Sequence, residues 1–156
     1  MNEWCKRALL SHFHRQETEL SRIFEGLGSL KVLGMVQFGS TVRGEATEQS
    51  DTDLLLVMDP KTPIERHLYQ TWETLLKKLS VKTDYAPQFV SLPDDPSLVG
   101  SLWYEVAMEG RVLIDPTGRV HQFLSQLRYW ILEHQLTRQT SHGHPYWVRG
   151  DLGHAK

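Results

Sequence analysis

The feature that most restricts what this chain can fold into is an almost unbroken apolar run at residues 53–58, DLLLVM. A strand with one face in water alternates polar and apolar side chains, whereas a strand covered on both faces is apolar at nearly every position. The run is therefore predicted to be a central strand of a sheet, with packed elements on both faces. Asp59-Pro60 ends it, because such residues punctuate strands.

Further segments supply partners for this strand. Residues 31–38 (KVLGMVQF) are predicted to form a second buried strand, which ends at Gly39-Ser40. Residues 86–92 are predicted as a third strand, and Pro87 suits an edge or a strand start because proline has no N–H for a central ladder. Apolar side chains recur at helical spacing in four predicted helices: residues 2–26, 63–79, 96–109 and 120–136. This order predicts an α+β (α/β-like) fold, a mixed sheet flanked by helices.

Charge and cysteine content restrict the partners and the cellular compartment that we expect for this chain. The net charge of -2 provides no global basic field that would draw the chain to nucleic acid. Cys5 is the single cysteine, which excludes an intramolecular disulfide framework and fits a reducing compartment. The first residues carry charges and lack the apolar segment of a signal peptide, and no apolar run is long enough to span a bilayer. We therefore expect a cytoplasmic protein with no membrane partner.

The segment that carries chemical information follows the first predicted strand. Gly39 has no side chain, so a phosphate can approach the backbone closely there. Ser40 is predicted to cap a short helix through residues 41–45, whose free amides and positive end would face a nucleotide phosphate. Arg43 would add positive charge beside it. These residues are the candidate nucleotide-binding group.

Ten residues after this turn, Asp51-x-Asp53 opens the central strand. Residues two apart in an extended chain point to the same face, so the two carboxylates are expected to lie side by side. A cation relieves their repulsion, and oxygen ligands of this kind suit magnesium that bridges to substrate phosphates. Paired metals clamp the oxygens of an in-line displacement, as in nucleotidyl transfer. Either motif alone is common in turns and helix caps, but the two together between buried strands favour a catalytic metal site.

The segment FGSTVRGEATEQSDTDLLLVMD resembles the GS-x10-D-x-D signature of the minimal nucleotidyltransferases, within the DNA polymerase beta-like superfamily. The resemblance implies the nucleotidyltransferase fold, with a C-terminal helical extension in this chain. It also implies Mg²⁺ or Mn²⁺ at Asp51 and Asp53, with Gly39 and Ser40 holding the triphosphate. The implied reaction moves a nucleoside monophosphate from a nucleoside triphosphate, ATP by expectation, to a hydroxyl of a protein, RNA or small-molecule acceptor. Some members are antitoxins that adenylylate a partner toxin.

This chain departs from the family pattern at the position of the third carboxylate. The family places it on a following strand, where this chain reads VKTDYAPQFVSL, and Asp84 is the acid in that stretch. It precedes Pro87, and Gln88 is the alternative occupant of the position. Asp84 is the candidate third ligand or general base, since a base must accept the proton of the attacking hydroxyl. Without it, the alternative function is a nucleotide-binding antitoxin or regulatory partner protein with weak or no catalysis.

The end of the chain is predicted to differ from the rest. One nucleotidyltransferase domain is expected over residues 1–139, including its C-terminal helices, with a core at about 1–115. The polar, histidine-rich remainder at 140–156 is expected to be a loose tail unless residues 146–148 (YWV) dock it. Its histidines do not have the spacing of a zinc module. It is open at this point whether the tail folds back over the site.

Overall fold

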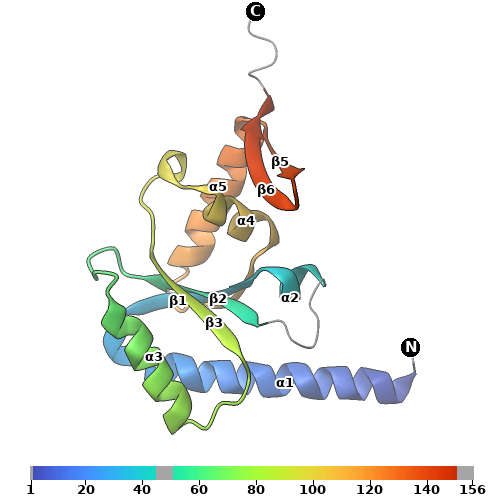
Figure 1. Ribbon diagram of the computed structural model, residues 1–156, viewed down its shortest axis with the longest axis vertical. Helices are drawn as coiled ribbons and strands as arrows, with labels where there is room; N and C mark the ends of the chain where they lie inside the picture. Colours follow the sequence, from blue (N-terminus) through green and yellow to red (C-terminus); the bar gives the residue numbers. More distant parts are fainter. Residues whose placement is uncertain (1, 45–50, 151–156) are drawn as a thin grey trace, which may run out of the picture.

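The computed structural model describes residues 2–44 and 51–150 of the chain (Figure 1). One sheet contains four strands in the order β3-β2-β1-β4: β1 (Val32–Phe38), β2 (Thr52–Met58), β3 (Tyr85–Ser91) and β4 (Arg111–Ile114). β1 runs antiparallel to β2 and to β4, whereas β2 runs parallel to β3. The predicted mixed sheet is confirmed, and the apolar run at 53–58 lies inside it as β2.

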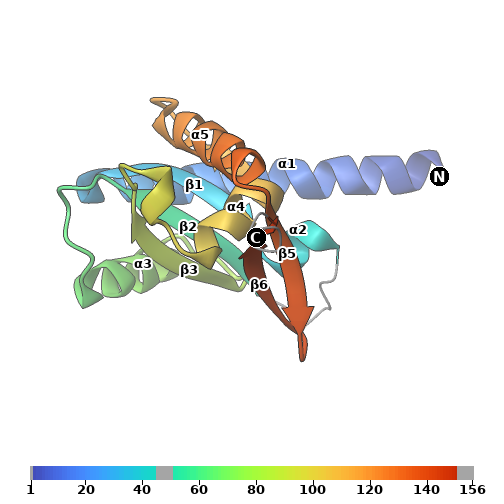
Figure 2. The same ribbon diagram turned by 90° about the horizontal axis from the view of Figure 1, so that it is seen from above.

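Helices cover both faces of this sheet, as the two views show (Figures 1 and 2). One face carries α1 (Glu3–Gly26) and α3 (Arg66–Lys78), and the other carries α4 (Ser101–Glu109) and α5 (Arg119–Glu133). In the described residues, three short helices lie in the connections: η1 (Gly28–Leu30), α2 (Ser40–Arg43) and η2 (Pro96–Leu98). None of the described helices is both long and apolar enough to cross a membrane.

β2 explains why the sheet is covered on both faces. Leu54, Leu56 and Met58 pack in the cluster formed with α1 and α3, and they are 0% exposed. Leu55 and Val57 pack in the opposite cluster, formed with α4 and α5, and they are also 0% exposed. Burying each such side chain stabilises the fold by about 1.5–3 kcal/mol. The strand therefore holds the two halves of the core together and fixes which face each of its residues occupies.

The edge position predicted from Pro87 is confirmed, because β3 is an outer strand of the sheet. Pro87 lies opposite Leu54 in the parallel register. Phe89 anchors the strand to α3 through edge-to-face contacts with Tyr69 and Trp72, at ring-centroid distances of 5.0 and 6.4 Å. These contacts hold β3 in the register that decides which of its residues approach the motif.

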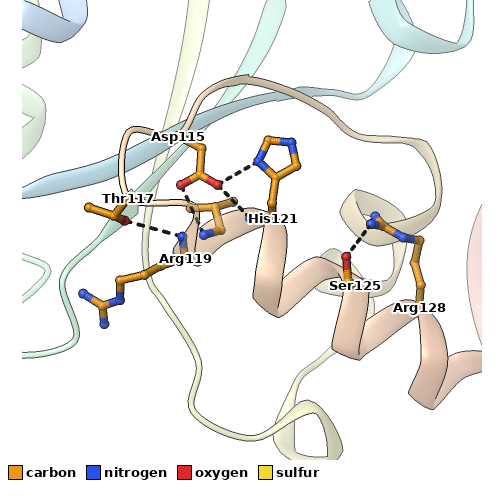
Figure 3. A network of polar contacts seen from close by, with 7 residues as sticks. Asp115, Thr117, Arg119, His121, Ser125 and Arg128 are labelled. Atoms are coloured by element: carbon orange, nitrogen blue, oxygen red, sulfur yellow. Dashed lines mark hydrogen bonds and ion pairs between the residues drawn. The ribbon is translucent and has the colours of Figure 1, made fainter.

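A buried carboxylate organises the start of α5 (Figure 3). The side chain of Asp115 is only 1% exposed, and it accepts hydrogen bonds from the backbone N–H groups of Val120 (3.3 Å) and His121 (2.9 Å). The ring Nδ1 of His121 lies 2.8 Å from the same carboxylate. Burial by itself would raise the pKa of Asp115, but the bonds from His121 and Val120 lower it below its usual value. Asp115 thus satisfies N–H groups in the first turn of this helix, whose N-cap residue is Gly118.

Two segments differ from the sequence-based expectation. The helix predicted over 96–109 is divided into η2 and α4, which begins only after Gly100. The chain after α5 forms a hairpin of β5 (Leu136–Ser141) and β6 (His144–Arg149), where a helix end and a polar tail were expected. Its two-residue turn, His142-Gly143, has φ values of 51° and 79°, as the tight turns of twisted hairpins require. β5 has exposed polar side chains on both faces, so little apolar pattern reveals it.

Candidate functional site

The two halves of the motif meet at the ends of β1 and β2. Phe38, the last residue of β1, lies opposite Asp53 in the antiparallel register. Gly39 follows with φ 83° and ψ -158°, a conformation that is essentially restricted to glycine. A Cβ added there would overlap Oδ2 of Asp53 and lie 3.1 Å from its Cγ. Glycine is therefore required twice, by the backbone and by the carboxylate packed against it.

The short helix predicted after this turn is present as α2, between β1 and β2. Its N-cap is Gly39 rather than Ser40, which is the first helical residue. The prediction of Ser40 as the cap is wrong because the turn is set by the glycine conformation. Gly44 ends the helix at φ 73°. The side chain of Arg43 and residues 45–50 lie outside what the structure describes.

Asp51 and Asp53 lie at the beginning of β2. Asp53 is the second residue of β2 and is partly buried, while Asp51 is exposed immediately before the strand. By strand alternation Asp53 shares the face of Leu55, which is the α4 and α5 side of the sheet. Thr52 between them is buried. Two carboxylates supply the oxygen donors that a hard divalent cation prefers, so the donor set fits magnesium or manganese.

The register of β3 decides where the third acid stands. Ala86 lies opposite Asp53 and Gln88 lies opposite Leu55, so β3 presents no carboxylate beside Asp53. Asp84 is exposed just before β3, and its carbonyl oxygen accepts a hydrogen bond from the N–H of Thr52 at 2.9 Å. That bond brings Asp84 next to the Asp-x-Asp segment. In the described part of the chain, no three His, Cys, Asp or Glu side chains gather closely enough to bind one metal ion.

A cleft of about 400 Å³ opens beside the Gly39 turn. Its walls come from the end of β1, from α4 and from the β5–β6 hairpin: Phe38, Gly39, Leu102, Glu105, Glu109, Arg138, Thr140, Gly143 and Pro145. The C-terminal segment therefore does fold back toward the motif. The charged residues of this cleft were not found from the sequence, because they come from segments about 30 residues apart and match no spacing pattern.

Two side chains of the hairpin, Arg138 and Trp147, fasten it to α4. Arg138 bonds through Nε to Oε1 of Glu105 at 3.0 Å and through Nη1 to Oε1 of Glu109 at 2.9 Å. Trp147 donates its indole N–H to the same Oε1 of Glu105 at 3.1 Å and packs on Tyr104, with ring centroids 5.5 Å apart. The docking expected of residues 146–148 thus runs through the tryptophan.

The opposite face of the motif is closed by α1. A second cavity of about 380 Å³ lies there, lined by Arg15, Gln16, Glu19, Thr52, Thr83 and Tyr85. The Tyr85 hydroxyl donates to Oε1 of Glu19 at 2.7 Å. Burial, and then this bond to Glu19, raise the pKa of Tyr85 far above its usual value, so the phenol stays neutral. The bond fixes α1 against the beginning of β3, behind the aspartates.

Comparison with known protein families matches the part of this architecture that contains the motif. The family model described as "Nucleotidyltransferase domain" matches residues 18–99, which is just over half of the chain. The match includes β1, β2, β3 and the complete motif, and it ends before α4. No curated protein matches the chain significantly.

Several solved structures of toxin–antitoxin complexes are similar to this chain. One is a toxin–antitoxin with AMP-PNP (17% identity, TM-score 0.45, covering 74% of this chain and 91% of that chain). A second is a tri-AMPylated Shewanella oneidensis HEPN toxin with MNT antitoxin (16%, 0.46, 78% and 92%). A third is a toxin–antitoxin MntA–HepT (15%, 0.42, 78% and 92%).

Proposed function

Since the chain belongs to the nucleotidyltransferase domain family, we propose that it is a metal-dependent nucleotidyltransferase. It moves a nucleoside monophosphate from a nucleoside triphosphate, with ATP as the expected donor, to a hydroxyl group. The observation that carries this proposal is the contact of Gly39 with the carboxylate of Asp53. A turn that admits a phosphate and a carboxylate that binds a cation are thereby adjacent, as transfer from a metal-bound triphosphate requires.

The triphosphate is assigned to the turn between β1 and α2. Gly39 leaves its backbone open to a phosphate oxygen, and the first N–H groups of a helix have no partner within that helix. Ser40 adds a hydroxyl at the same place, and Arg43 is the cation assigned to this group. Asp51 and Asp53 would hold Mg²⁺ or Mn²⁺, which when bound neutralises charge on the phosphate oxygens.

The chemical step needs a base for the acceptor. The acceptor oxygen forms a bond to the α-phosphorus, the bond from that phosphorus to the bridging oxygen breaks, and pyrophosphate leaves. The hydroxyl proton passes to a nearby base. We assign this role to Asp84, because its backbone is hydrogen-bonded to Thr52, between the two aspartates. Asp84→Asn is then expected to lower kcat with little change in the KM for the triphosphate.

A protein hydroxyl is the acceptor that best suits this chain. Its net charge of -2 offers no general attraction for RNA, and the basic stripe that an RNA-end transferase needs is missing from the sequence. A protein partner, toxin-like in the antitoxin members of the family, remains the preferred acceptor class. The reaction is assigned to the cytoplasm.

The second candidate function is a regulatory nucleotide-binding protein with weak or no catalysis. The observation that favours it is the register of β3, which sets Ala86 and Gln88 where a strand acid would face Asp53 and Leu55. On this alternative the chain neutralises its partner by binding it. Recovery of a stoichiometric partner that is unaffected by Asp51→Ala and Asp53→Ala, together with the absence of transfer, would favour the alternative.

Transfer of label from each α-³²P-labelled nucleoside triphosphate separates these functions. The full chain is incubated with Mg²⁺ and the protein encoded beside it, and label on protein is measured. Asp53→Ala is expected to reduce transfer to background, whereas Asp94→Ala, on the exposed loop after β3, is the matched control and should retain activity. Full activity of Asp53→Ala would refute the metal assignment.

A further inference from the structure

The cleft beside Gly39 has a chemical character of its own. Its near wall is Phe38 and Gly39, and its far wall is α4 with the β5–β6 hairpin, which lies beyond the residues matched by the family model. The far wall carries two carboxylates, Glu105 and Glu109, against one guanidinium, Arg138. Among the described residues of this wall the carboxylates outnumber the guanidinium, so the wall favours a group that donates hydrogen bonds.

Glu109 stands close to the phosphate turn. Glu109 is the last residue of α4, two residues before Arg111, which pairs with Gln37 of β1, and Glu109 and Gly39 line the same cleft. Glu105 precedes it by four residues on α4, which places both carboxylates on one face of the helix. The two form a row that leads away from the turn and along the cleft.

The carboxylate of Glu105 has acceptor capacity that the described residues leave unused. Its Oε1 accepts from both Arg138 and Trp147. Its Oε2 is buried, and no group in the described part of the chain donates to it. An ionised carboxylate accepts about four hydrogen bonds, and rotation about its terminal torsion is broad and permissive. Glu105 also lines the cleft, so a hydroxyl group bound there is a candidate donor to this carboxylate.

We propose that this cleft holds the nucleoside of the triphosphate, and that Glu105 and Glu109 accept hydrogen bonds from the ribose hydroxyls. This inference rests on the proposed function, which puts the phosphates at Gly39. A volume of about 400 Å³ is within the range of small-molecule sites. Phe38, Leu102 and Pro145 supply apolar walls for the base. The protein then selects ribonucleotides over deoxyribonucleotides through its C-terminal segment.

Equilibrium binding tests this proposal without an acceptor or turnover. Titration calorimetry of the full chain with Mg²⁺ compares ATP, 2′-deoxy-ATP and 3′-deoxy-ATP. At least one deoxy analogue should bind about tenfold or more weakly, because it lacks a hydrogen bond to a charged acceptor. The readout is the dissociation constant of that deoxy analogue divided by the dissociation constant of ATP. In Glu109→Ala this ratio should fall to about one. In Glu109→Gln it should be intermediate, because a neutral acceptor bonds more weakly.

Two controls keep the interpretation specific. Glu133→Ala removes an exposed carboxylate of α5 outside the cleft and should leave the ratio unchanged. Glu105→Gln retains an acceptor for Trp147 and should reduce the ratio without releasing the hairpin. Equal binding of all three nucleotides to the unmodified chain overturns the nucleoside site but leaves the proposed function intact. If no nucleotide binds, the proposed function itself fails.

Discussion

Replacement of Gly39 by alanine tests the contact of this turn with Asp53, although it also strains the backbone at the same residue. The conformation at φ 83° and ψ -158° lies where only glycine is normally found, and forcing another residue there costs about 1–3 kcal/mol. For a chain of this size, about 2 kcal/mol corresponds to a fall in Tm of roughly 4–8 °C. The new Cβ would also displace the carboxylate of Asp53, with which it overlaps. We expect a folded protein with a lower Tm and no transfer activity.

Gly44 supplies the matched control for this variant. It has φ 73°, so Gly44→Ala also introduces backbone strain, of about 1–2 kcal/mol, but no atom lies within 4 Å of the added Cβ in the described structure. Gly28→Ala adds a Cβ in open space at a residue without positive φ and should change neither property.

The assay is thermal denaturation, followed by transfer of label from α-³²P-ATP, measured well below each variant's Tm. Strain alone predicts similar losses of stability in Gly39→Ala and Gly44→Ala, whereas only Gly39→Ala should be inactive. If Gly39→Ala retains transfer at the level of Gly44→Ala, the contact between the turn and Asp53 is not part of the site.

Two further predictions concern the elements that frame the site. Trp147→Phe removes one hydrogen bond to Glu105 but keeps an aromatic ring to pack on Tyr104. Amide hydrogen exchange in the hairpin should become faster, corresponding to a free energy of local opening that is lower by about 1–2 kcal/mol. Unchanged exchange would mean that Trp147 does not anchor the hairpin. Asp115 has a lowered pKa in the folded chain, so its contribution to stability is present above the pKa of the unfolded state and is lost as pH falls through the folded value. The free energy of unfolding, measured with urea from pH 6 to 3, should therefore fall more steeply for the unmodified chain than for Asp115→Asn. Parallel pH dependences of the two proteins would contradict this.

The elements that could be predicted from the sequence are those whose burial is visible in composition. The run at 53–58 is apolar because both faces of β2 are covered, and Pro87 indicated an edge because its ring removes a donor. The hairpin after α5 was not predicted, because its burial leaves no comparable mark on the composition. Its first strand, LTRQTS, is polar on both faces, so no period of two in hydrophobicity reports it.

The structure places Gly39 against Asp53 because Phe38 pairs with Asp53 where β1 ends and β2 begins. The third acid was beyond sequence reasoning, since a shift of one residue in the register of β3 would exchange the faces of Ala86 and Pro87. The place of Arg138 in the cleft could not be predicted from the sequence either. It meets Glu105 only because the hairpin folds back on α4.

The boundary of the family match divides the proposed site into two parts, which are assigned to different portions of the nucleotide. Residues 18–99 contain the Gly39 turn and both aspartates, which are assigned to the triphosphate and the metal. The glutamates of α4 and the hairpin lie after that boundary and are assigned to the sugar. The two parts touch at Gly39, which lines the cleft and also packs against Asp53. Substitutions in the hairpin should therefore alter which nucleotide binds while the phosphate turn remains intact, whereas substitutions at Gly39 should disturb both.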